Sequence, residues 1–216
     1  FGGPLVKDRL WFFLSGRYGA QASQVTLPQT GIGLSSVDTN KRGEIKITGT
    51  PKSSHTLQGG YFNNSRNQTN WSGAQSFVID PHSEDTLRYP NWYVFTNYRG
   101  VVNSNYLVEA QYAERRFELL GGGTGTDLVK DSPFFAATLC ACLYNAPYFD
   151  ATDTERRNNR QATASISRSW NLRGQHTTKA GYEFYRSQRM GGGSQSPTSY
   201  VFVADFVTNA EGSPVL

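Results

Sequence analysis

Two cysteines, Cys140 and Cys142, are separated by one residue, and thiols at such a spacing could bind a metal ion or form disulfides. Strand neighbours two positions apart point the same way, and their Cβ geometry is poor for a mutual disulfide. A metal site would need further ligands, but His55, His82 and His176 are far apart in the sequence. We therefore predict no metal and no cofactor. The cysteines are better interpreted as two thiols in a loop, or as half of a bridge to another part of a longer protein.

Catalytic motifs are missing from the sequence. It contains no Gly-x-Ser-x-Gly nucleophile elbow, no His-x-x-Glu pattern and no phosphate-binding loop. The glycine-rich segments 121–125 and 191–193 are better interpreted as flexible loops. We therefore predict no catalytic residues and no enzymatic activity.

Polar side chains instead recur at every second position of several segments. For example, Arg42, Glu44 and Lys46 alternate with the apolar residues Ile45 and Ile47. Such alternation is typical of a strand with one polar and one apolar face. Residues of the polar parity are candidates for lining a water-filled lumen: Arg17, Arg42, Glu44, Lys46, Glu109, Gln111, Lys179 and Glu183. A role as solvated lining ranks above direct ligand contact for these residues.

The same alternation predicts seven strands, which are longer than the five or six residues usual in globular proteins. They are expected over residues 10–21, 38–50, 55–67, 92–102, 106–119, 157–170 and 176–188. An eighth, apolar segment, 200–207, could be a strand or a loop. Short turns are expected at 51–54, 103–105 and 171–175, and long loops at 19–37, 65–90, 120–155 and 189–198.

The composition excludes several classes of protein. Charged residues make up 18% of the 216 residues, against about 25% in an average soluble domain. The longest apolar run, 10–14, is far shorter than the roughly 20 residues of a transmembrane helix. The net charge of +4 is small and scattered, so a nucleic-acid partner is not expected. An aromatic content of 13% argues against disorder.

Strands that alternate in this way suit either a soluble β-sandwich or a transmembrane β-barrel. A sandwich would place Val, Ile and Leu on its buried faces, whereas these faces carry Gly, Ala, Tyr and single aliphatic residues. Aromatic residues near strand ends match the girdles of membrane barrels. The residues concerned are Trp92, Tyr93, Tyr106 and Trp170. The pattern therefore favours an all-β, antiparallel, up-and-down transmembrane barrel segment.

Three motifs strengthen this interpretation. The opening FGGPLVKDRLWFFLSGRY (1–18) resembles the start of the barrel in TonB-dependent outer-membrane receptors, and especially the Oar-like branch with its carboxypeptidase-regulatory-like domain. In that family such a stretch joins the plug to the first barrel strand. The matching junction residues are Gly2, Gly3, Pro4, Lys7 and Asp8. Segment 170–184, and more weakly 51–61, resemble a barrel hairpin motif of the same family.

The resemblance implies energised uptake of a substrate across the outer membrane of a Gram-negative-type bacterium. Residues 1–216 would form about seven to eight strands of a larger, 22-stranded barrel. The plug, the TonB box and the remaining strands would lie outside this chain, which we expect to be a piece of a longer protein. The first strand would leave the plug and run outward, so that every long loop is extracellular. The implied partners are outer-membrane lipid, the protein's own plug, the TonB system and an open ligand class, with carbohydrate and peptide as candidates.

Two alternatives stay open. One is a self-contained, eight-stranded outer-membrane barrel whose interior is filled with side chains. The other is a secreted, carbohydrate-binding β-sandwich that would use Trp71, Trp92 or the aromatic loop patch as stacking platforms.

Overall fold

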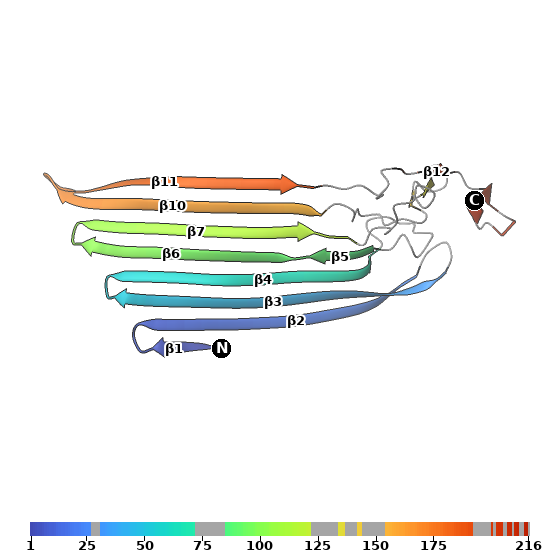
Figure 1. Cartoon of the computed structure of the whole chain (residues 1–216), viewed down its shortest axis with the longest axis horizontal. Helices are drawn as coiled ribbons and strands as arrows, with labels where there is room; N and C mark the ends of the chain where they lie inside the picture. Colours follow the sequence, from blue (N-terminus) through green and yellow to red (C-terminus); the bar gives the residue numbers. More distant parts are fainter. Residues whose placement is uncertain are drawn as a thin grey trace.

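The structure is a computed structural model. It describes residues 1–26, 31–71, 85–121, 134–136, 142–143, 154–191, 200, 202–204, 207–208, 210–211 and 214–215. These residues form an all-β protein dominated by one antiparallel, nine-stranded sheet. Its strands follow one another in the order β1-β2-β3-β4-β6-β7-β10-β11, and β5 pairs with β4. Figure 1 shows this up-and-down sheet as one layer, with the tight turns gathered at one end.

The strands of the main sheet are long. They are β1 (Gly2–Val6), β2 (Leu10–Thr26), β3 (Gly33–Lys52), β4 (His55–Trp71), β5 (Asp85–Tyr89), β6 (Asn91–Asn103), β7 (Tyr106–Leu119), β10 (Glu155–Asn171) and β11 (Gln175–Met190). All seven strands predicted from the sequence are confirmed. The range 106–119 agrees at both ends, and the other six strands are longer than expected.

Two predicted loops are wrong in extent. The loop expected over 19–37 is reduced because β2 continues to Thr26 and β3 begins at Gly33. Pairs such as Ser23 with Ser36 keep the hairpin in register there. Likewise, β4 continues to Trp71 and the short β5 lies within the loop expected over 65–90. Backbone pairing does not need an apolar face, so polar segments extend the strands beyond their amphipathic part.

The three predicted short turns are confirmed, and their residues explain them. The carbonyl oxygen of the Asn103 side chain accepts hydrogen bonds from the backbone amides of Asn105 (2.9 Å) and Tyr106 (3.1 Å). This is the local side-chain bonding for which asparagine is favoured in turns. In the β10–β11 turn, Arg173 and Gly174 both have positive φ, and the amide of Leu172 donates to the carbonyl of Gly174.

The N-terminal motif forms a hairpin that was not predicted from the sequence. Gly2, Gly3 and Pro4 lie in β1, which pairs antiparallel with the start of β2. Lys7 and Asp8 lie in the turn between the two strands, where Asp8 has a φ of 58°. Proline is tolerated in β1 because β1 is an edge strand.

The segment 200–207 does not add an eighth long strand to the main sheet. Its described residues include β12 (Phe202–Ala204), which pairs parallel to β8 (Phe134–Ala136), and β8 also pairs with β9 (Cys142–Leu143). A further pair joins β13 (Val207–Thr208) to β14 (Pro214–Val215). The loop predictions at 120–155 and 189–198 fall largely outside the described residues.

The register divides the main sheet into two chemically distinct faces. Residues directly opposite each other on an antiparallel pair point to the same side. The polar face carries Glu109, which pairs with Ser165, and the apolar face carries Ala110, which pairs with Ala164. Leu87 is the one buried hydrophobic residue among those described. The described sheet is open, because its strand order runs from β1 to β11 without closing, and it has no hydrophobic core on either side.

Candidate binding surface on the polar face

All eight polar residues singled out from the sequence lie on the polar face. Arg17 pairs with Arg42, and Gln111 pairs with Thr163, which in turn pairs with Glu183. Within each strand, the sequence predicts which alternate residues share a face. Only the register between strands shows that the polar residues of all seven strands point to the same side of the sheet. The register separates the eight residues into two groups, one on β2 and β3 and one on β7 and β11.

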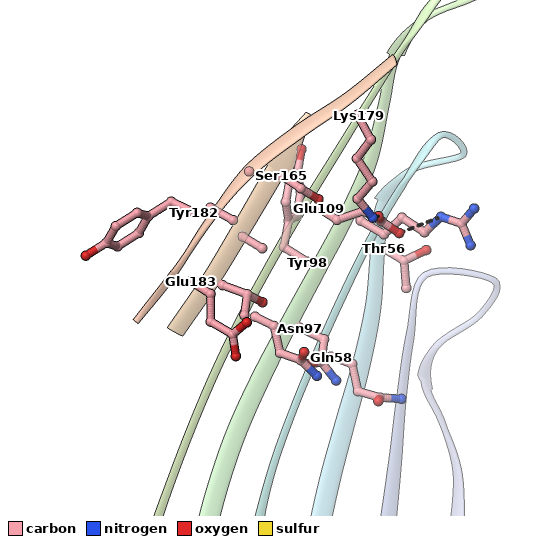
Figure 2. A pocket seen from close by; sticks show the side chains of 15 residues that line it. Thr56, Gln58, Asn97, Tyr98, Glu109, Ser165, Lys179, Tyr182 and Glu183 are labelled. Atoms are coloured by element: carbon pink, nitrogen blue, oxygen red, sulfur yellow. Dashed lines mark hydrogen bonds and ion pairs between the residues drawn. The ribbon is translucent and has the colours of Figure 1, made fainter. Parts of the chain in front are cut away.

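An ionic cluster lies at the centre of the second group (Figure 2). The Nζ atom of Lys179 on β11 donates to Oε2 of Glu109 on β7 at 2.9 Å. Nε of Arg99 on β6 lies 3.8 Å from the other carboxylate oxygen, Oε1. The residues beside Glu109 on the next two strands are small. Glu109 pairs with Ser165 on β10, and Ser165 pairs with Gly181 on β11. The long lysine side chain can therefore cross β10 and reach the carboxylate.

Uncharged hydrogen-bonding side chains surround this cluster and line a hollow of about 680 Å³. The amide of Gln58 donates to the hydroxyl of Thr48 at 3.2 Å, and the amide of Gln161 donates to Glu183 at 2.7 Å. The side-chain oxygen of Asn97 is buried and has no hydrogen-bond partner. An unpaired buried acceptor is costly, so this oxygen is a weak point in the hydrogen bonding around the hollow.

Figure 2 shows how the strand pleat separates the two faces at this point. Lys179 and Glu183 project toward the hollow, whereas Tyr182 projects to the opposite side of β11. Backbone and side-chain atoms of both parities border the hollow, but its charged and amide groups come from the polar face.

The first group forms a separate patch on β2 and β3. The hydroxyl of Ser15 donates to Glu44 at 3.3 Å, and Arg42 lies 3.7 Å from the same carboxylate. The guanidinium of Arg42 also lies over the ring of Phe62, 4.6 Å from its centroid, and Lys46 lies over the ring of Phe13 at 5.7 Å. Arg17 pairs with Arg42 in the same patch. These four residues do not line the hollow.

Sequence reasoning missed the residues that β4 and β6 contribute to the hollow. They are Thr56, Gln58, Asn97, Tyr98 and Arg99. Asn97 and Arg99 occupy alternate positions of β6, as residues of one face do. Large aromatic residues on both faces of β6, however, obscure the alternation of polar and apolar residues that would have identified them. Tyr93, for instance, pairs with Phe62 and Arg115 on the polar face. The prediction that Tyr93 belongs to an aromatic girdle beside Trp92 is therefore wrong.

Several large side chains of the apolar face are exposed. Ile45, Leu57 and Ile166 are 40%, 50% and 46% exposed, and Tyr182 is 72% exposed. Aromatic residues bracket this surface on two neighbouring strands: Trp92 and Tyr98 on β6, and Tyr106 and Tyr112 on β7. The stretch from Tyr106 to Tyr112 spans about 20 Å of strand. We call the apolar-face residues between these aromatic ends the apolar band.

The described residues of the polar face offer donors, acceptors and charge. Among the described residues, no cluster of three or more His, Cys, Asp or Glu side chains could hold a metal ion. Cys140 lies outside the described residues, and Cys142 lies in β9. In the part of the chain that the structure covers, no helix is long and apolar enough to cross a membrane. Hydrogen bonding to a polar ligand is what this arrangement can do.

No protein-family model, curated protein or solved structure matches the chain. The interpretation of its function therefore depends on the two-faced sheet and on the residues that carry the resemblance described above.

Proposed function

We propose that this chain forms part of the β-barrel wall of a TonB-dependent receptor in the outer membrane of a Gram-negative-type bacterium. In that role the apolar face contacts lipid and the polar face lines a water-filled lumen. A substrate passes through this lumen in an energised uptake step. The single observation that carries the proposal is the two-faced, single-layer sheet, with its apolar face uncovered by any described residue.

Water would be a poor solvent for that face. Fully burying one large apolar side chain stabilises a fold by roughly 1.5–3 kcal/mol, and the half-exposed side chains of the apolar band forgo part of that stabilisation. A soluble sandwich covers such a face with a second sheet, whereas the described residues provide none. Membrane hydrocarbon covers the face without requiring a second layer, and this consideration favours a barrel wall over a sandwich.

The aromatic residues support the same orientation. Tyr and Trp side chains have an apolar body and a polar tip, and they gather where hydrocarbon meets headgroups. On the apolar face, Trp92 and Tyr98 enclose Val94 and Thr96 along β6. Charged side chains resume beyond this interval, for example Glu114 on β7. The uncharged interval is of the same order as the roughly 25 Å apolar zone of an outer-membrane barrel.

A membrane location also requires the sheet edges to be paired. Unpaired backbone groups are not tolerated in hydrocarbon, so a spanning sheet must close on itself. The described sheet is open at the side of β11 and at the side of β1 and β2. Under the proposal, further strands of a longer protein close the barrel, and a plug occupies its lumen.

Two experiments test this function. The full-length protein, produced in a Gram-negative host, is expected in the outer-membrane fraction and to resist extraction by alkaline carbonate. Recovery as a soluble protein would contradict the barrel and favour the carbohydrate-binding sandwich. The full-length protein in detergent is also expected to be retained by the immobilised periplasmic domain of TonB. Membrane insertion without that retention would contradict energised uptake and favour a small passive barrel.

A further inference from the structure

Four arginines gather on the apolar face immediately beyond the apolar band, at the end of the sheet opposite the tight turns. They are Arg116, Arg156, Arg160 and Arg186, which we call the arginine cluster. Together with Glu114 and Glu118 they line a hollow of about 350 Å³. The cluster borders the band directly, because Arg160 lies two residues before Ala162 and Arg186 lies two residues after Phe184.

The charges in this hollow are unbalanced. Arg116 forms an ion pair with Glu114 at 3.0 Å, and Arg156 forms one with Glu118 at 3.2 Å. The structure shows no ion pair between Arg160 or Arg186 and any described carboxylate. The hollow therefore carries two positive charges in excess.

Those two charges face each other. Arg160 and Arg186 are directly opposite in the register of β10 and β11, and both residues are exposed. On its other side Arg160 is opposite Glu114 of β7, whose carboxylate already forms the ion pair with Arg116. Like charges directly opposite on an antiparallel pair are destabilising. Beside a membrane this repulsion is less screened than in bulk water, because the low-dielectric hydrocarbon lies next to it. An anion held between the two guanidinium groups would remove the repulsion.

Guanidinium groups bind phosphate through two parallel N–H···O bonds, and several arginines around one hollow are suited to a phosphate monoester. The position of the hollow selects the source of that phosphate. It opens on the same face as the apolar band, so an anion attached to acyl chains can place its chains on Ala162 and Phe184 while its phosphate reaches the arginines. A free anion would gain nothing from that neighbouring surface.

We infer that the arginine cluster binds the phosphate of an anionic membrane lipid in the leaflet at this end of the sheet. The inference depends on the proposed function, because it requires the apolar face to contact lipid. It adds a lipid-binding site on the outside of the wall, distinct from the hollow on the polar face.

The test uses the full-length protein in detergent micelles, titrated with phosphatidic acid as the phosphate-monoester lipid. Bound lipid is counted by native mass spectrometry. Phosphatidylcholine with the same acyl chains and inorganic phosphate are titrated in parallel. We expect phosphatidic acid to bind at least about tenfold more tightly than either. Equal binding of phosphatidylcholine would overturn the inference, as would equally tight binding of inorganic phosphate.

Substitutions assign the binding to the cluster. Arg160→Gln combined with Arg186→Gln is expected to weaken phosphatidic acid binding about tenfold or more, since two charge-assisted interactions are lost. The matched control is Arg115→Gln, which removes an arginine from the polar face of β7 at the same end of the sheet. The control should bind as the unmodified protein does. Unchanged binding in the double variant, or equal loss in the control, would overturn the inference.

The single variant Arg186→Gln is tested as well, in case the double variant does not fold. This change removes the repulsion with Arg160, so the lipid-free protein should be at least as stable to heat, while its phosphatidic acid binding falls. Lower stability together with unchanged binding would overturn the inference. A protein found in the outer membrane whose arginine variants still bind lipid normally would refute only the lipid site. A protein never found in membranes would refute both this site and the proposed function.

Discussion

Lys179 on β11 donates a hydrogen bond to Glu109 on β7, with 2.9 Å between Nζ and Oε2, although the two residues are 70 positions apart. The bond spans β10, so it connects two strands that do not pair with each other. The bond is possible because Ser165 and Gly181, the neighbours of Glu109 on β10 and β11, do not have bulky side chains that would block the lysine. This contact orders one side of the hollow on the polar face.

Reversing the charge of Glu109 should disturb that order. Glu109→Lys places three cations together with Lys179 and Arg99, and we expect the thermal midpoint of the full-length protein in detergent to fall by a few degrees. Adding Lys179→Glu restores an opposite pair and should recover most of the loss. The effect is modest because the pair is exposed to solvent. If Lys179→Glu in the reversed background gives no recovery, the contact does not stabilise the sheet.

The two faces should respond oppositely to the same substitution. Ala164→Arg places a charge within the apolar band and is expected to destabilise the membrane-inserted protein by about 2–4 kcal/mol. Ser165→Arg places the same charge one residue further on, on the polar face. It should cost much less, and the folded fraction at increasing urea concentration measures both changes. Equal losses for the two variants would contradict the assignment of lipid and water to the two faces.

The turn between β6 and β7 depends on one side chain. Asn103→Ala removes the acceptor of two backbone amide bonds and should lower the free energy of unfolding by about 1 kcal/mol. Asn105→Ala is the matched control, because the Asn105 side-chain oxygen accepts only from the hydroxyl of Ser104, at 3.3 Å, among the described contacts. Thermal unfolding in detergent should separate the two variants. A larger effect at Asn105 would show that the turn is held in another way.

The aromatic residues near the tight turns include a polar pair on the apolar face. Nδ1 of His55 lies 2.8 Å from the hydroxyl of Tyr98, at hydrogen-bond distance. Tyr98→Phe removes this bond and should cost about 1 kcal/mol of stability. Tyr106→Phe on the next strand is the control, because the ring under the guanidinium of Arg168 is kept. Indistinguishable unfolding midpoints for the two variants would contradict a role for the pair.

Strand-level structure was predictable from the sequence wherever one face is apolar. The alternation of Arg42, Glu44 and Lys46 with Ile45 and Ile47 needs no tertiary information, and the strand that contains these residues is confirmed. Where the alternation stops, as at Ser23 and Ser36, the strands continue on backbone pairing alone. Period-two reasoning had no signal for that continuation.

The candidate site was predictable only in part, for a different reason. Parity alone identified Glu109 and Lys179 as polar-face residues. Their contact depends on the register of β7 with β10 and on the register of β10 with β11. A tight turn fixes only the second of these registers. Asn97 and Arg99 were missed because aromatic residues on both sides of β6 obscure its polar parity. The arginine cluster was missed because its members come from three strands and lie on the face read as apolar.

The most direct test of the central claim is the pattern of water accessibility along β10. Cysteines are introduced singly at positions 162 to 166 of the full-length protein in membranes, after Cys140, Cys142 and any further native cysteine are replaced by serine. A water-soluble maleimide should label positions 163 and 165, whereas positions 162, 164 and 166 should react only after detergent solubilisation. Equal labelling at all five positions, or labelling of the even positions alone, would contradict a wall with lipid on one face and water on the other.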